Sequence, residues 1–131
     1  MALQQTNDVK LEIARGIYLK SGFYAWVNLN NISFRQMVPG PNAVPISRHG
    51  EIETVLEFYE SKEEKFSEDP SVRKPPYYSK NYRINLNDTD FIWSVSEING
   101  LDTYDLIIRD ICKYFVRIFE KEDVLCDIVD L

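Results

Sequence analysis

The sequence has few of the residues on which common catalytic and metal-binding motifs depend. Among its 131 residues are one histidine, two cysteines and five scattered glycines. The single histidine, His49, cannot build a histidine-rich metal site, and the sequence contains no glycine-rich phosphate loop and no Gly-x-Ser-x-Gly motif. We therefore expect no catalytic residue, no cofactor and no metal ion.

Long apolar runs are also missing. No stretch approaches the roughly twenty apolar residues of a membrane span. The start of the chain, from Met1 to Asp8, lacks the basic and apolar regions of a signal peptide. Cys112 and Cys126 match no zinc or redox spacing, so we expect two buried free thiols. These absences predict a cytoplasmic protein that does not contact a membrane.

The composition itself is that of an ordinary globular protein. Hydrophobic residues make up 44% of the chain and charged residues 27%, which excludes a disordered chain, a fibre and a disulfide scaffold. The length suits one domain, and neither a linker nor an internal repeat divides the chain. We expect a single domain over residues 1–131.

Five segments have the alternating, β-branched or aromatic pattern of strands, namely 9–19, 23–29, 32–37, 82–86 and 91–98. Gly16 interrupts the first of them, as a bulge would. Asn30 and Asn31 suit a tight turn between the next two, because asparagine tolerates positive φ. The first three segments therefore predict an antiparallel meander, followed by a proline-rich loop over 38–48.

Two segments have helical periodicity, 51–65 and 103–121. In the first, Ile52, Val55, Leu56 and Tyr59 are spaced as one face of a helix. The second carries a longer apolar stripe, made of Tyr104, Ile107, Ile108, Ile111, Cys112, Phe115, Ile118 and Phe119. The prediction is an α+β fold in which these two main helices pack an antiparallel sheet of about five strands. The apolar end of the chain, 123–131, is either a last strand or a helical turn.

The negative charge is unevenly distributed. The net charge is -6, and residues 51–131 hold ten basic and nineteen acidic side chains, a net of -9. On a helix over 51–65, Glu53, Glu57, Glu60 and Glu64 would form one stripe that no lysine faces. Such a stripe is either a plain solvated face or a surface that meets a basic partner and speeds association with it.

The prolines of segment 67–81 predict a long loop that contains Tyr77 and Tyr78. Tyrosine is enriched in protein interfaces, so these two residues are either partner contacts or anchors for the loop. Basic residues interleaved with tyrosines can also bind single-stranded nucleic acid. The net negative charge argues against a nucleic-acid partner, because phosphates would be repelled.

These features predict a small acidic inhibitor that binds a basic protein partner. The concrete form is an immunity protein or antitoxin that neutralises a toxin such as a nuclease, with Glu53, Glu57, Glu60, Glu64, Tyr77 and Tyr78 as its contact residues. Two alternatives remain open. One is a self-associating module that uses an exposed strand edge. The other is a small ligand-binding or enzymatic domain that uses carboxylates from distant segments.

Overall fold

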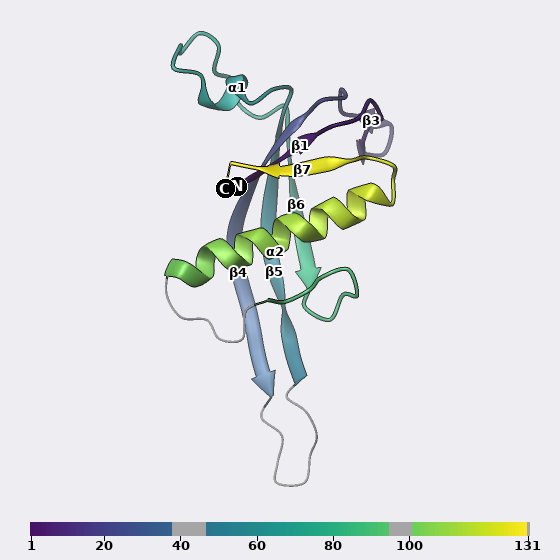
Figure 1. Cartoon of the computed structure of the whole chain (residues 1–131), viewed down its shortest axis with the longest axis vertical. Helices are drawn as coiled ribbons and strands as arrows, with labels where there is room; N and C mark the ends of the chain where they lie inside the picture. Colours follow the sequence, from purple (N-terminus) through teal and green to yellow (C-terminus); the bar gives the residue numbers. More distant parts are fainter. Residues whose placement is uncertain (38–46, 95–100, 131) are drawn as a thin grey trace.

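The structure, a computed structural model that describes residues 1–37, 47–94 and 101–130, is an α+β protein (Figure 1). A five-stranded antiparallel sheet has the order β6-β5-β4-β1-β7, and a separate two-stranded sheet pairs β2 with β3. The strands are β1 (Ala2–Gln5), β2 (Glu12–Ala14), β3 (Ile17–Tyr18), β4 (Tyr24–Met37), β5 (Ser47–Tyr59), β6 (Tyr78–Asn85) and β7 (Cys126–Val129), and the helices are α1 (Glu63–Phe66) and α2 (Leu101–Glu120). The predicted class and the antiparallel sheet of about five strands are confirmed.

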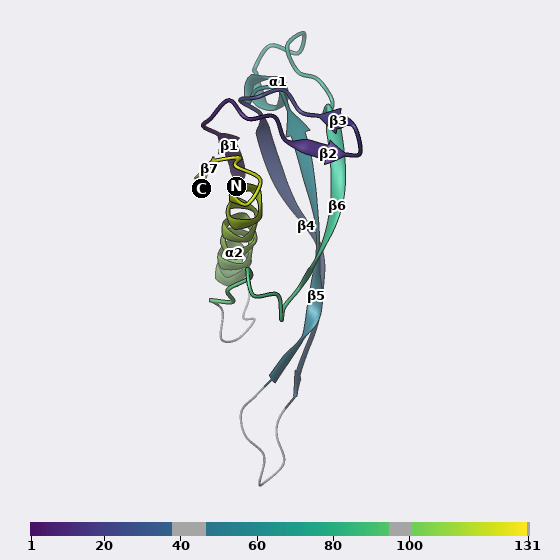
Figure 2. The ribbon, with the colours of Figure 1, turned by 90° about the vertical axis from the view of Figure 1, so that its right-hand side faces the viewer.

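Helix α2 covers one face of the large sheet, which we call the inner face (Figure 2). The predicted stripe supplies the contact: Ile111 and Phe115 of the helix are fully buried in one core with Leu56 and Phe58 of β5. Because these apolar residues recur with the helical period, folding brings most of them onto the core together. The helix predicted over 103–121 is therefore confirmed. Tyr104, at the start of the stripe, is exposed.

The helix predicted over 51–65 is wrong, because most of that segment is strand β5. Ile52, Leu56 and Phe58 are buried in the core and alternate with residues on the opposite face, which we call the outer face. Thr54 completes the inner set, and its hydroxyl donates to the carbonyl oxygen of Asn28 at 2.6 Å, so this polar side chain is buried at little cost. Helical structure begins only at α1, a single turn.

The predicted turn at Asn30 and Asn31 is also wrong, and with it the predicted three-strand meander, because β4 runs through both residues as one strand whose neighbours in the sheet are β5 and β1. A shift of register between Leu29 and Asn31 marks an irregularity there. Strands β4 and β5 pair along their whole length, from Tyr24 opposite Tyr59 to Met37 opposite Ser47. Their far ends extend beyond the other strands as a two-stranded arm (Figure 2).

The other elements complete the two sheets. Segment 9–19 is not one strand: Gly16, with φ of 76°, lies in the turn that joins β2 to β3. The strand predicted over 82–86 is present and begins earlier, at Tyr78. The end of the chain forms β7, which pairs with β1, so the first of the two alternatives for 123–131 is correct.

Two further predictions fall partly outside the described residues. Residues 91–94 of the strand predicted over 91–98 are not in a strand, and 95–98 lie outside the described ranges. Of the loop predicted over 38–48, residues 38–46 are outside them, and Ser47 and Arg48 begin β5. Both cysteines are buried free thiols, as expected. Within the described ranges, no helix is long and apolar enough to cross a membrane.

Candidate functional site

The four glutamates of the predicted stripe do not share one helix face. Glu53 and Glu57 lie on the outer face of β5, Glu60 follows the end of that strand, and Glu64 belongs to α1. Glu53 and Glu57 are four residues apart, and this spacing puts two side chains on the same face of a strand as well as on the same face of a helix. The predicted surface is therefore divided between a strand and the segment 60–77, which leaves the sheet after β5 and returns to it at β6.

Cationic side chains face three of these carboxylates, contrary to the expectation of an unpaired stripe. Glu53 lies 3.6 Å from Nε of Arg83 on the neighbouring strand. The Nζ atoms of Lys65 and Lys74 lie 3.7 Å from carboxylate oxygens of Glu57 and Glu64, respectively. Ion pairs this close to the surface add little stability, but they lower the local negative potential.

Glu60 differs from the other three glutamates. It is exposed, and its carboxylate makes no ion pair with the residues that the structure describes. Its backbone N–H donates to a carboxylate oxygen of Glu64 at 3.2 Å, which ties the end of β5 to α1. Glu60 is thus the one member of the predicted set that presents a carboxylate without a described cationic partner.

The two tyrosines of the predicted site have different surroundings. Tyr77 is 58% exposed, and its backbone N–H donates to the carbonyl oxygen of Phe58 at 2.8 Å. Tyr78 is the first residue of β6, and its half-buried ring packs against the core on the inner face. Adjacent residues of an extended chain point to opposite sides, so only Tyr77 presents its ring to solvent.

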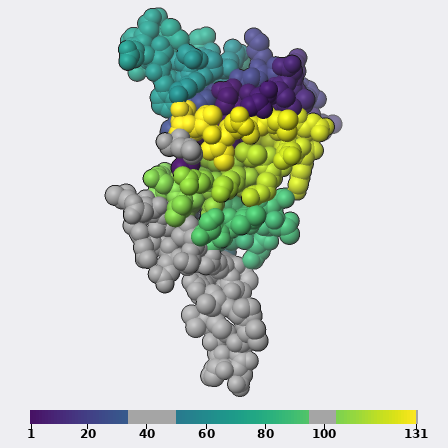
Figure 3. Space-filling view, viewed as in Figure 1, coloured from purple at the N-terminus to yellow at the C-terminus, as the bar shows by residue number. Residues whose placement is uncertain are grey.

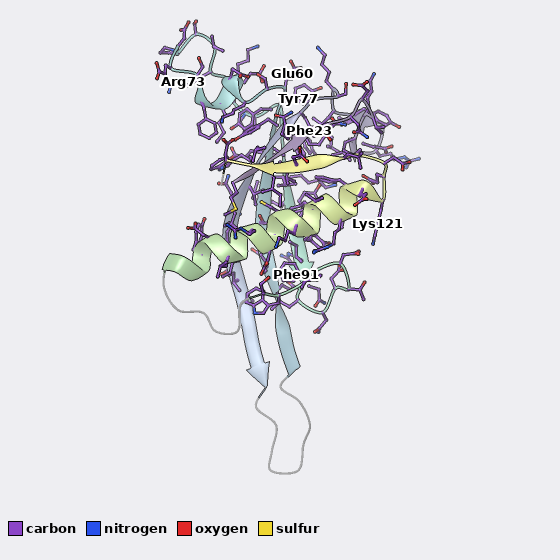
Figure 4. All side chains as sticks on the ribbon, in the orientation of Figure 1. Phe23, Glu60, Arg73, Tyr77, Phe91 and Lys121 are labelled. Atoms are coloured by element: carbon purple, nitrogen blue, oxygen red, sulfur yellow. The ribbon has the colours of Figure 1, made fainter. Side chains whose placement is uncertain are left out.

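Glu60 and Tyr77 meet at a cavity of about 280 Å³, which we call the tyrosine cavity. Its lining residues are Lys10, Tyr18, Leu19, Lys20, Phe23, Tyr59, Glu60 and Tyr77. Phe23 and Tyr59 are buried, whereas Tyr18, 52% exposed, and Tyr77 leave much of their ring surface accessible. Figure 4 shows Phe23, Glu60 and Tyr77 close together at this end of the molecule. The cavity thus combines an aromatic lining with charged groups of both signs.

The phenols of Tyr18 and Tyr59 are hydrogen-bond donors at neutral pH. A hydrogen bond to the Glu12 carboxylate raises the pKa of Tyr18, and the negative charge of Glu12 adds to the effect. Burial is the main cause that raises the pKa of Tyr59. Aromatic rings and charged side chains line the cavity together, so it is suited to binding through ring contacts, hydrogen bonds and ion pairs.

Beside the cavity, three aromatic rings surround the ammonium group of Lys65. Its Nζ lies 5.3 Å from the ring centroid of Trp26, 5.2 Å from that of Tyr59 and 5.4 Å from that of Phe66. The Glu57 carboxylate also lies near Nζ, at 3.7 Å, and the Tyr59 hydroxyl lies 3.3 Å from it. All three rings are within the distance at which cation–π attraction is significant. We call Trp26, Glu57, Tyr59 and Phe66 the lysine box.

Side-chain contacts fix the geometry of the lysine box. Tyr59 lies opposite Tyr24, and Glu57 lies opposite Trp26, in the register of β4 and β5. The Trp26 indole N–H donates to the side-chain oxygen of Asn28 at 3.0 Å, and the Asn28 amide in turn donates to Glu57. These contacts hold the rings and the carboxylate on the sheet independently of Lys65.

Phe66 brings α1 onto the outer face. Its ring makes edge-on contacts with Tyr24 and Trp26, with centroids 6.3 and 5.2 Å apart. A second tie comes from Lys62, whose Nζ donates to the Asp130 carboxylate at 2.6 Å, and the Tyr24 hydroxyl donates to the same group at 2.5 Å. These two hydrogen bonds, the one from Lys62 first, lower the pKa of Asp130. In the space-filling view, segment 60–77 forms one end of the molecule (Figure 3).

Sequence reasoning did not identify Trp26, Lys65 and Phe66, or the lysines and Tyr18 of the cavity. One signal was available. At the start of segment 23–29, the residues on both sides of the strand are apolar or aromatic. Phe23 and Ala25 point to one side, and Tyr24 and Trp26 point to the other. A strand that is apolar on both sides is covered on both faces, so a second covering element was required.

Neither a metal site nor a similarity to known proteins helps to define the function of this site. Within residues 1–37, 47–94 and 101–130, no group of three histidine, cysteine, aspartate or glutamate side chains is placed to hold a metal ion. No protein-family model, curated protein or solved structure matches the chain significantly. The candidate site is therefore defined by geometry alone, as the tyrosine cavity and the neighbouring lysine box, which share Tyr59.

Proposed function

We propose that this chain is a small cytoplasmic inhibitor that binds and neutralises a protein partner, as an immunity protein or antitoxin does. The observation that carries the proposal is the tyrosine cavity, with the exposed rings of Tyr18 and Tyr77 beside buried Phe23 and Tyr59. Tyrosines that contact a partner's side chains in a desolvated pocket are frequent hot spots of protein interfaces. Exposed rings around a cavity are therefore suited to anchoring a partner.

The cavity suits the side chains of a protein partner. Its volume of about 280 Å³ lies near the lower limit of roughly 300 Å³ for pockets that hold drug-sized ligands. It is large enough for one or two side chains of a partner. Lys10, Lys20 and Glu60 add charges of both signs at its rim, so the inserted segment would carry both acceptors and donors.

The net charge of -6 supports a partner of positive charge. Long-range attraction between opposite charges raises association rates and falls with added salt. Since Glu53, Glu57 and Glu64 have cationic neighbours, we assign the largest share of this attraction among the four glutamates to Glu60, beside the cavity.

Co-expression with the product of the neighbouring gene, followed by titration of the purified pair, tests this function. We expect Tyr77→Ala and Tyr18→Ala each to raise the dissociation constant by about tenfold or more, as truncating a hot-spot residue does. Tyr104→Ala is the matched control, because Tyr104 is 48% exposed and does not line the cavity. Equal effects of all three substitutions would rule out the cavity as the contact surface.

A variant of Glu60 tests the electrostatic part separately. We expect Glu60→Gln to lower the association rate at low salt and to reduce its salt dependence, with little change in the dissociation rate. Glu53→Gln is the control, because Arg83 already faces Glu53. An unchanged association rate in Glu60→Gln would show that this carboxylate does not attract the partner.

Self-association is the second candidate function. Strand β6 forms one edge of the large sheet and pairs only with β5 among the described strands, so one side of its backbone is open to another chain. Measuring the mass in solution at two protein concentrations separates the candidates. A concentration-independent monomer is expected for the inhibitor, and a stable homodimer would favour the second candidate.

A further inference from the structure

The lysine box has the composition of a site that binds an ammonium group of a ligand. Aromatic rings on several sides of a cation, with a carboxylate beside them, are the means by which proteins bind methylated lysine and choline. Here Trp26, Tyr59, Phe66 and Glu57 provide that arrangement, and Lys65 of the same chain fills it. We propose that the lysine box is a binding site for an external ammonium group, and that Lys65 occupies it in the free protein and leaves it when the ligand binds.

Lys65 is placed so that it can leave the box. Its side chain is 20% exposed, so it is not enclosed in the protein interior. It belongs to α1, a four-residue helix. Its flexible four-carbon stem can reorient by rotation about single bonds, without movement of the backbone. Rotation of this one side chain therefore empties the box.

The rest of the box does not depend on Lys65. Trp26, Glu57 and Tyr59 lie on paired strands, and Asn28 connects the indole of Trp26 to the Glu57 carboxylate. Phe66 is held by its own ring contacts with Tyr24 and Trp26. A site whose walls stay in place is organised before the ligand arrives, which lowers the entropic cost of binding.

The negative charge of the chain indicates which ligands reach the box. A net charge of -6 attracts cations and repels anions. The ligand class is an ammonium group, either on a lysine side chain of a protein, methylated or not, or as a small free quaternary ammonium. This proposal does not depend on the proposed inhibitor function, because the box is formed by residues of this chain whether or not a partner uses the tyrosine cavity.

Competition by Lys65 sets the size of the expected effect. A ligand that binds only the vacated box has an apparent dissociation constant raised in inverse proportion to the vacant fraction. If Lys65 fills the box nine-tenths of the time, the wild-type protein binds about tenfold more weakly than a variant that lacks the ammonium group. Lys65→Met is the best such variant, because it keeps an unbranched apolar stem and removes the charge.

The experiment is a titration of the full chain with tetramethylammonium chloride, followed through the indole N–H signal of Trp26 by two-dimensional NMR. Comparison with Trp26→Phe assigns that signal, because Trp93 gives the other one. Sodium chloride at equal ionic strength controls for screening. The α-acetylated methylamides of lysine and trimethyllysine form a second arm, which distinguishes a protein side chain from a free quaternary ammonium as the preferred ligand.

We expect a saturable shift of the Trp26 signal in Lys65→Met and binding about tenfold weaker in the wild type. Adding Glu57→Gln to Lys65→Met should weaken binding again, since the carboxylate is lost. Lys113→Met, which removes an exposed lysine on α2, should behave like the wild type. In the wild type, the ligand should move the Lys65 side-chain signals toward those of free lysine as they leave the rings.

Three results would overturn the proposal. One is a folded Lys65→Met whose Trp26 signal does not respond. Another is equal binding by Lys65→Met and the wild type, because Lys65 would then not occupy the site. The third is loss of folding in both Lys65→Met and Lys65→Ala, because Lys65 would then be a required part of the fold and could not leave.

Discussion

The two faces of the large sheet are covered in different ways. On the inner face, the twenty-residue helix α2 buries a continuous apolar core. On the outer face, the buried cluster among the described residues consists of Ala2, Tyr24 and Tyr59, with Trp26 and Val129 packed against it, and a single helical turn covers it through Phe66. The inner covering is held by apolar burial, and the outer one by the ring contacts of Phe66 and by polar contacts such as the ion pair between Lys62 and Asp130. The outer covering should therefore open without unfolding the protein.

The largest expected effect comes from the inner face. Phe115 of α2 is fully buried and contacts the rings of Tyr82 and Phe119. Because its removal leaves a cavity, Phe115→Ala should lower the free energy of unfolding by about 3–5 kcal/mol. Urea denaturation followed by circular dichroism measures this loss. A loss under about 1 kcal/mol would mean that the inner face is not the main source of stability.

A smaller effect is expected when the corresponding ring is removed from the outer face. Phe66 is 47% exposed, so Phe66→Ala should lower the free energy of unfolding by about 1–2 kcal/mol, less than full burial of the ring would give. The same urea experiment applies. A loss equal to that of Phe115→Ala would erase the difference between the two faces.

Adjacent tyrosines provide a sharper comparison at one place in the chain. Tyr78 packs on the core, so Tyr78→Ala should cost about 1–2 kcal/mol of stability. Tyr77 is exposed, so Tyr77→Ala should change stability by less than about 0.5 kcal/mol while it weakens partner binding. Thermal and urea unfolding of the pair test this. A larger loss of stability in Tyr77→Ala than in Tyr78→Ala would contradict the assignment of Tyr78 to the core and of Tyr77 to the surface.

The smallest effect concerns pH and the contact between Lys62 and Asp130. The hydrogen bonds from Lys62 and Tyr24 lower the pKa of Asp130 from its ordinary value of 3.8. A group with a lowered pKa in the folded state stabilises that state above its unfolded pKa, and the stabilisation is lost as the pH falls through the folded value. We expect the stability difference between the wild type and Asp130→Asn to be constant from neutral pH to about pH 5 and to decrease as the pH falls below 3.8. A difference that is independent of pH would contradict the role of the Asp130 charge.

The local pattern of apolar residues was sufficient to predict α2 as a helix but not to predict β5 as a strand. A few residues explain the difference. Helical spacing explains the whole of α2, and no alternating pattern competes with it. In β5, Ile52 and Leu56 fit both a helix and a strand. Val55 favoured the helix, while Thr54 concealed the alternation because it is polar and buried. Its partner is the Asn28 carbonyl oxygen, a contact that exists only after β4 and β5 pair.

The same limit applies to β4 and to the candidate site. Asn30 and Asn31 have the composition of a turn, but pairing with β5 along the whole strand outweighs that local preference. Glu60 and Tyr77 were predicted as contact residues and lie at one cavity. The lysine box could not be predicted, because it requires the register of two strands and the return of segment 60–77 over them.

Native-state hydrogen exchange tests the central claim, which is that the outer covering opens independently of the core. The amide of Lys74, which donates to the Glu64 carbonyl oxygen at 2.7 Å, reports on segment 60–77, and the amides of Ile111 and Phe115 report on α2. We expect the Lys74 amide to exchange at a lower free energy, with little dependence on dilute urea, whereas the α2 amides exchange with the urea dependence of global unfolding. If all three amides exchanged with the same free energy and the same urea dependence, the two coverings would form one cooperative unit and the claim would be contradicted.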